Sequence, residues 1–276
     1  MLLSFLLVAL IRDAQPLGTR TVVVAPCGTP VGSSILQMLR RRPEIAVRAL
    51  ASTEAEASAA RVSACGAKLC GNGRCEDLCA SSFPSLDVVV ARTDRETRDA
   101  VAGAMSLIVL TDEGHPRIMP LPNGDAVVVA AEDDDARRCG AVARRLVDAA
   151  VAERVPHVVL LSCLDADTLP RVLASRGVAG GVAETRRALE AKLRASGSRH
   201  SVIRAAPIAE SDEELRAIDA RARGDRPPLV ARPALARALL NAALDASNAR
   251  RGVYELASSR GPGVGHYGVG RRAGGA

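Results

Sequence analysis

The sequence predicts an α/β fold with a doubly wound, mostly parallel sheet. From residue 21 onward, short continuous apolar runs alternate with segments of helical periodicity, which is the pattern of parallel strands buried on both faces. The connections between these segments are short, and right-handed crossovers of that kind place helices on both sides of a sheet. With 276 residues, of which 48% are hydrophobic, the chain is long enough to bury one large core.

The predicted strands are the apolar runs at residues 21–24, 46–51, 86–90, 107–110, 157–161, 201–204 and 252–256. A helix is predicted over residues 32–42, and its inner side carries Val31, Ile35, Leu36 and Leu39. Another helix begins in the acidic cluster 133–135, where negative charge suits the positive end of the helix dipole. These elements form one series in which strands and helices alternate.

The chain divides into a main domain over residues 20–258 and two terminal segments. Residues 1–19 begin with an apolar run that is too short to span a bilayer, so we expect no membrane span there. A targeting leader and a segment packed on the domain both remain open. The compartment therefore stays open between the cytoplasm and an organelle such as a plastid. The Gly- and Arg-rich residues 259–276 are expected to form a flexible tail.

The basic charge of the chain does not point to nucleic acid. The formal net charge is +6, but Lys occurs only at Lys68 and Lys192, and the Arg residues are interleaved with Asp and Glu. Aromatic residues, on which bases stack, amount to two Phe, two Tyr and no Trp. We therefore expect no nucleic-acid partner.

The turn after the first strand has the features of a phosphate-binding loop. A dinucleotide pyrophosphate needs a tight turn, close approach of the backbone and the N-terminus of a helix. Residues 25–34 read APCGTPVGSS, with glycines at Gly28 and Gly32 between the first strand and the first helix. Alone, two glycines are a weak motif, because any strand-to-helix turn uses them.

The loop resembles that of the atypical short-chain dehydrogenase/reductase and NmrA-like proteins, which runs approximately Gly-Ala-Thr-Gly-Pro-Val-Gly and matches Pro26 to Gly32 here. Residues 47–50, 88–104, 106–111, 147–162, 193–204, 235–239 and 252–256 continue the resemblance in the same order. The resemblance implies a single-domain Rossmann fold that binds NADP or NAD, with small C-terminal elements on the substrate side. The residues that it assigns to the cofactor are Cys27, Gly28, Thr29, Pro30, Val31, Gly32, Ser52, Thr111 and Arg186.

The catalytic residues of that family are only partly present. The family uses a Tyr as general acid/base, a Lys four residues later and a Ser that orients the carbonyl. Ser162 matches the Ser region, whereas the Tyr position falls near Val182 and the Lys position near Arg186. Arginine keeps its charge and its fork of donors, so it does not simply replace Lys. Ordinary Tyr-dependent reduction is therefore not expected.

The choice of cofactor stays open between NAD and NADP. The resemblance places an NADP-selecting Arg directly after the second strand, and this chain has Ser52 there, followed by Thr53 and Glu54. Hydroxyl groups would accept a 2′-phosphate, whereas Glu54 would favour the free ribose hydroxyl of NAD.

Two functions follow from the resemblance. One is an NAD(P)-dependent oxidoreductase that acts on a small organic substrate without the Tyr-Lys pair. The other is a non-catalytic NmrA-like redox sensor, scaffold or assembly factor with a protein partner.

Four cysteines, Cys65, Cys70, Cys75 and Cys79, lie in an insertion at about residues 62–82. Four thiolates can bind zinc or an iron-sulfur cluster, but the paired two-residue spacing of such sites is absent. Metal ligation, disulfides and free thiols all remain open. The four histidines show no metal-ligand spacing, and His157 leads into an apolar strand, where we expect a packing or hydrogen-bonding role.

Overall fold

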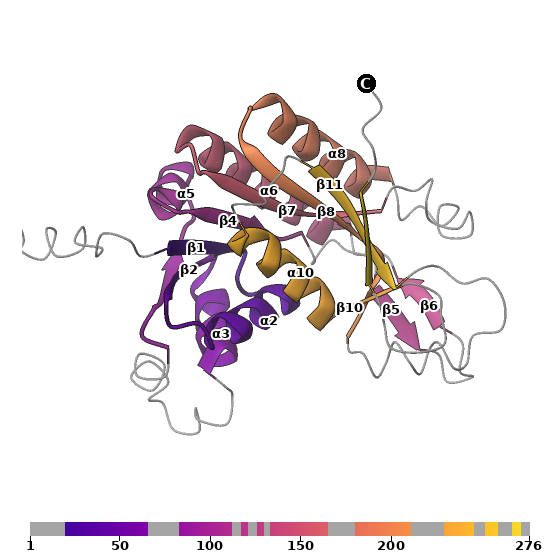
Figure 1. Ribbon diagram of the computed structural model, residues 1–276, viewed down its shortest axis with the longest axis horizontal. Helices are drawn as coiled ribbons and strands as arrows, with labels where there is room; N and C mark the ends of the chain where they lie inside the picture. Colours follow the sequence, from indigo (N-terminus) through magenta and orange to yellow (C-terminus); the bar gives the residue numbers. More distant parts are fainter. Residues whose placement is uncertain are drawn as a thin grey trace, which may run out of the picture.

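A computed structural model describes residues 20–65, 83–111, 117–120, 126–129, 133–164, 180–210, 229–245, 252–258 and 267–271. An eight-stranded sheet with the order β12-β11-β8-β7-β4-β1-β2-β3 forms its centre (Figure 1). Its strands are β1 (Arg20–Ala25), β2 (Ile45–Ala51), β3 (Leu86–Val90), β4 (Ser106–Val109), β7 (His157–Cys163), β8 (Arg199–Ala205), β11 (Gly252–Ser258) and β12 (Tyr267–Arg271). All neighbours pair in parallel except β11 and β12. The predicted doubly wound α/β fold is confirmed.

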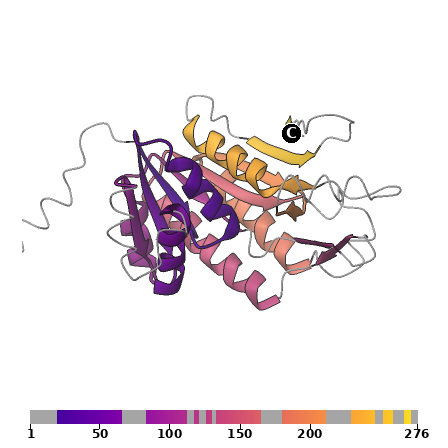
Figure 2. The same ribbon diagram turned by 90° about the horizontal axis from the view of Figure 1, so that it is seen from below.

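The described residues form six helices, which cover the sheet in two layers. The two layers can be followed in Figures 1 and 2. One core cluster contains side chains of α2 (Pro30–Leu39), α3 (Glu54–Cys65) and α10 (Arg232–Leu244). The other contains side chains of α5 (Asp94–Val101), α6 (Asp133–Ala152) and α8 (Gly180–Ala195). Both faces of the sheet are therefore covered by helices.

The strands are buried on both faces because their apolar runs are continuous. Val22 and Val24 belong to the cluster beneath α2 and α10, whereas Val23 belongs to the cluster on the opposite face. All three side chains are fully buried. Successive residues of a strand point to opposite faces, so a run without polar interruptions fits a central parallel strand.

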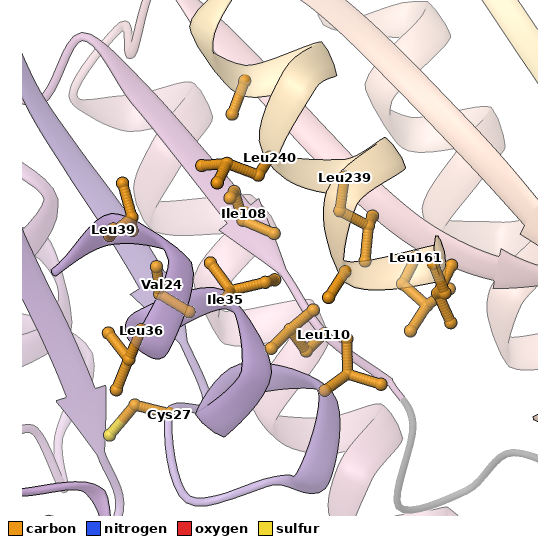
Figure 3. Packing of buried hydrophobic residues seen from close by; sticks show 14 of the residues in the cluster. Val24, Cys27, Ile35, Leu36, Leu39, Ile108, Leu110, Leu161, Leu239 and Leu240 are labelled. Carbon is orange, nitrogen blue, oxygen red and sulfur yellow. The ribbon is translucent and has the colours of Figure 1, made fainter. Parts of the chain in front are cut away.

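Helix α2 packs across the sheet on α10. Its buried residues Val31, Ile35, Leu36 and Leu39 are those that the helical periodicity predicts. Figure 3 shows Ile35 of α2 next to Ile108 of β4, on the side that faces Leu239 and Leu240 of α10. This packing fixes the start of α2 next to the carboxyl end of β1.

A second, small sheet with the order β10-β9-β5-β6 lies beyond the carboxyl ends of the main strands (Figure 1). It consists of β5 (Arg117–Pro120), β6 (Ala126–Val129), β9 (Ile208–Ala209) and β10 (Val230–Ala231). The sequence analysis expected only small C-terminal elements on the substrate side, and it did not predict this sheet. The Asn123-Gly124 dipeptide, a common turn signal between two antiparallel strands, was the available indication.

The structure also forms β12 inside the segment that we expected to be a flexible tail. Its residues Tyr267–Arg271 pair antiparallel with β11. Within the described parts of the chain, no helix is both long and apolar enough to cross a membrane.

His157 lies at the amino end of β7, opposite to the edge that carries the predicted site. Its Nε2 is 3.1 Å from Ser201 Oγ, and its buried Nδ1 has no hydrogen-bond partner. Burial, together with smaller effects of the neighbouring His200 and Arg199 charges, lowers the pKa of His157 from 6.5 to about 4. The expected packing role of this residue remains a prediction, and its titration provides a test.

The lowered pKa predicts a loss of stability in mild acid. Because the folded His157 binds its proton less readily than the unfolded one, stability is complete above about pH 6.5 and falls as the pH drops toward 4. Between pH 7 and pH 5 we expect this residue to lower the free energy of unfolding by about 2 kcal/mol. Urea unfolding across this range measures the slope, and His157→Gln should flatten it. An unchanged slope in the variant would assign the acid sensitivity to other groups.

Candidate functional site

The turn that joins β1 to α2 closes on itself at the helix N-terminus. Thr29 is the N-cap residue, and its Oγ1 accepts a hydrogen bond of 3.0 Å from the Gly32 N–H. Pro30 occupies the first helical position, where its missing N–H costs nothing. Of the donors that a helix start offers to an anion, proline therefore removes one and Thr29 occupies another.

Gly32 is required by the close approach of α2 to the preceding turn. A Cβ on Gly32 would lie 2.9 Å from the Cys27 carbonyl oxygen and 3.0 Å from that of Pro26. Because both contacts are with backbone atoms, they cannot be relieved by a side-chain rotation. A Gly32→Asp variant would therefore disturb the fold as well as any bound phosphate, which makes it a poor probe of binding.

A shallow cleft lies between the carboxyl ends of the first three strands and helices α5 and α6. Its lining residues are Ala25, Pro26, Leu50, Ala51, Ser52, Ala91, Thr97, Val142, Arg145 and Leu146. The Arg145 side chain donates a hydrogen bond to the Arg92 carbonyl oxygen, which connects α6 to the segment after β3. The cleft is mostly apolar, with Ser52 and Arg145 at its polar edge.

Glu56, on α3, places its carboxylate next to the end of β2, and the sequence analysis did not single it out. Its Oε2 accepts a hydrogen bond of 2.7 Å from the Ser52 N–H. Glu54, the residue considered from the sequence, forms an exposed ion pair of 3.3 Å with Arg92 instead. Glu56 also packs against the turn, since a Cβ on Gly28 would lie 3.1 Å from the Glu56 Cβ and Cγ.

Cys27, in the middle of the turn, is an unreactive thiol. It is fully buried, and burial together with the nearby Glu56 charge raises the pKa of Cys27 to about 12. The thiolate, which is the nucleophilic form, is therefore suppressed at neutral pH. We assign Cys27 a packing role within the turn.

Two residues that the resemblance assigned to the cofactor meet at the end of β4. Arg186, on α8, donates a hydrogen bond of 2.6 Å from Nη2 to the Thr111 carbonyl oxygen. The Thr111 hydroxyl donates to the Leu161 carbonyl oxygen of β7 at 2.8 Å. Residues far apart in sequence thus converge at the carboxyl ends of β4 and β7.

Ser162 lies near the carboxyl end of β7, beside this point, but its hydroxyl group is already hydrogen-bonded. Its hydroxyl donates a hydrogen bond of 2.7 Å to Glu190 Oε1, and the residue is 1% exposed. Arg204 holds the same carboxylate with two bonds, from Nε at 3.0 Å and from Nη2 at 2.6 Å. In this arrangement Ser162 supports a buried ion pair, and its predicted catalytic role remains untested.

Solved structures place this architecture among known proteins, although no family model and no curated protein matches the sequence. A short-chain dehydrogenase/reductase from Veillonella parvula, in complex with NADP, is 11% identical with a TM-score of 0.55, over 86% of this chain and 94% of that one. The chain shares the doubly wound, mostly parallel fold of that protein.

Two further structures with this fold contain related cofactors. An NADPH-dependent quinone oxidoreductase from Escherichia coli, complexed with NADPH, is 19% identical with a TM-score of 0.52, over 86% of this chain and 69% of that one. The enzyme WbmH from Bordetella bronchiseptica, in complex with NAD+, is 16% identical with a TM-score of 0.52, over 87% and 76% of the two chains. At these identities the similarity concerns the fold.

The remaining predicted residues do not form a metal site in the described structure. Cys65 is disulfide-bonded, whereas Cys70, Cys75 and Cys79 lie outside the described residues. Over the described ranges, no group of three or more His, Cys, Asp or Glu side chains is arranged to hold a metal ion. For Cys65, the structure agrees with the disulfide alternative.

Sequence reasoning missed the buried pair of Glu190 and Arg204. Glu190 lies on the buried side of the amphipathic helix α8, and Arg204 lies in the buried strand β8. Charges are unusual at such positions, and both residues are less than 10% exposed. A glutamate four residues after Arg186 lies on the same side of a helix, which was the available signal.

Proposed function

We propose that this chain binds a nicotinamide dinucleotide across the carboxyl ends of β1, β2 and β4. The observation that carries the proposal is the start of α2 at the point between β1 and β4 where the strand order reverses. Ligands of open α/β sheets bind outside the carboxyl ends of the strands at such a point, and helix N-termini attract phosphates. The proteins of the same fold that contain NADP, NADPH or NAD+ support this proposal.

The residues present fit the cofactor in three places. The turn at residues 27–32 would hold the pyrophosphate, because Gly32 lets the backbone and helix approach each other closely. The adenosine half would lie against the mouth of the apolar cleft beside Ser52, which is too small to enclose it. The nicotinamide half would extend over β4 toward Thr111 and Arg186. When bound, the cofactor would supply or accept a hydride.

The choice between the two cofactors depends on Glu56. Its carboxylate lies at the end of β2 and accepts the Ser52 N–H. A 2′-phosphate placed there would be repelled, whereas a ribose hydroxyl could donate to the carboxylate. We therefore expect NADH to bind more tightly than NADPH.

The residues at the family's Tyr and Lys positions cannot form the usual acid/base pair. Val182 cannot transfer a proton, and Arg186 keeps its charge and binds a carbonyl oxygen. Ser162 already donates its proton to Glu190. An oxidoreductase with this fold would therefore act on a substrate whose reaction needs no tyrosine as proton donor. The missing pair equally supports the alternative, an NmrA-like redox sensor or scaffold in which the bound dinucleotide regulates a protein partner.

Variants of Thr29 test the dinucleotide site in two directions. Thr29→Asp keeps a cap for the Gly32 N–H but adds negative charge beside the pyrophosphate, so the affinity for NADH should fall at least about tenfold. Thr29→Gly releases the Gly32 N–H for the phosphate at a cost of only a few tenths of a kcal/mol in capping. The affinity of Thr29→Gly for NADH should rise by up to about tenfold. Calorimetric titration with NADH and NADPH measures both changes.

Thr29→Ser is the matched control, because it keeps the cap without adding charge, and its affinity should equal that of the wild type. Failure of the wild-type protein to bind either dinucleotide would overturn the proposed function. Equal shifts in Thr29→Asp and Thr29→Gly would place the binding site away from α2.

A further inference from the structure

Arg186 carries an unused hydrogen-bond donor in the interior of the protein. The residue is 3% exposed, and its Nη2 donates to the Thr111 carbonyl oxygen. Its Nη1 is buried and has no hydrogen-bond partner among the residues that the structure describes. Buried side-chain donors are almost always paired, so an unpaired guanidinium nitrogen requires an explanation.

Among the residues that the structure describes, no carboxylate pairs with Arg186. Glu190, one turn further along α8, is the buried carboxylate of the described structure, but Arg204 binds both of its oxygens. Arg194 adds a further contact of 3.0 Å with Glu190 Oε2, and Ser162 donates to Oε1. The one buried carboxylate of the described residues thus binds other partners, and within them Arg186 donates a hydrogen bond only to the neutral Thr111 carbonyl group.

An unmatched buried charge destabilises a folded protein, so its retention points to a ligand that supplies the opposite charge. We propose that Arg186 binds an oxyanion, a carboxylate or phosphate oxygen, on a small molecule held over the carboxyl ends of β4 and β7. The anion would accept a hydrogen bond from Nη1 while Nη2 remains on Thr111, a geometry that suits the planar guanidinium fork. The inference rests on the proposed function only for the position of this ligand.

Two anions distinguish the two sources of the oxygen. Malonate represents a carboxylate substrate, and nicotinamide mononucleotide represents the phosphate of a dinucleotide. Thermal unfolding is measured for the full chain with each compound, and the wild type is compared with Arg186→Met. Arg187→Met removes the same charge from an exposed position on the same helix and serves as the control.

We expect at least one anion to raise the Tm of the wild type and of Arg187→Met but not that of Arg186→Met. Without an anion, Arg186→Met should unfold at a higher temperature than the wild type, because it removes an unmatched charge. A malonate effect identifies a carboxylate substrate, and a mononucleotide effect identifies a phosphate. Equal responses in the wild type and Arg186→Met, or no response to either anion, would overturn the inference.

Arg186→Lys keeps the inference testable if the Met variant does not fold. Lysine retains the charge but cannot bind Thr111 and an anion with a rigid fork, so the anion affinity should fall at least tenfold with the fold retained. The Thr29 variants separate this result from the proposed function. Dinucleotide binding without an Arg186 effect would refute only the oxyanion inference, and an Arg186-dependent anion effect without dinucleotide binding would refute only the proposed function.

Discussion

Glu190→Gln should lower the free energy of unfolding by about 3–5 kcal/mol, the largest effect expected from a single substitution in the site. The Glu190 carboxylate is buried and binds Arg204 through two hydrogen bonds. Glutamine is similar in size but neutral, so Arg204 would remain charged in the interior without a counter-ion. One amide oxygen also cannot replace both carboxylate oxygens as acceptors. Equilibrium unfolding in urea measures the loss.

Glu184→Gln is the matched control, since Glu184 is exposed on the same helix and its replacement should change stability by less than about 0.5 kcal/mol. Replacing both Glu190 and Arg204 with Met should recover most of the loss, because the pair is then removed together. A loss below about 1 kcal/mol for Glu190→Gln would show that water reaches this pair.

Ile35→Ala should lower the free energy of unfolding by about 2–5 kcal/mol. Ile35 is fully buried where α2 crosses α10, in the cluster that Figure 3 shows. Truncation removes apolar contacts and leaves a cavity between two helices and the sheet, which cannot collapse without moving α2. Because α2 carries the Thr29 cap, the same variant should also weaken dinucleotide binding.

Ile35→Val provides the graded comparison, with an expected loss of about 0.5–1.5 kcal/mol and unchanged binding. Similar losses for Val and Ala would indicate that the helix relaxes into the space. In that case the packing of α2 on α10 would not be what positions the turn.

The strands could be predicted from the sequence because burial on both faces leaves a continuous apolar signal. Examples are residues 21–24, which form the centre of β1, and residues 157–161, which form most of β7. The small sheet was harder to predict because β9 and β10 contain two residues each. Such strands are defined by their partners rather than by periodicity. The same holds for β12, whose Gly-containing sequence YGVGR has little strand propensity of its own.

The sequence named candidate site residues whose role stays a prediction, but it could not show how their charges are arranged. The resemblance named Thr111 and Arg186, and the structure brings these residues together at 2.6 Å. What the sequence could not indicate was the distribution of charge. Whether Glu190 balances Arg186 or Arg204 depends on which side chains meet between α8 and the sheet, and three-dimensional packing decides this. Likewise, only the helix geometry shows that Glu56, rather than Glu54, reaches back to the end of β2.

The antiparallel strand β12 also affects how the sheet meets its surroundings. Without it, β11 would present a row of unpaired backbone N–H and C=O groups to any other extended chain, which is how sheets recruit strands during aggregation. A parallel partner for β11 would require another long crossover, whereas an antiparallel strand needs only a reversal of the chain. The last residues of the fold thus act as protection against intermolecular strand pairing. At the opposite edge, β3 carries the exposed charge of Asp87, which discourages the same pairing by a different means.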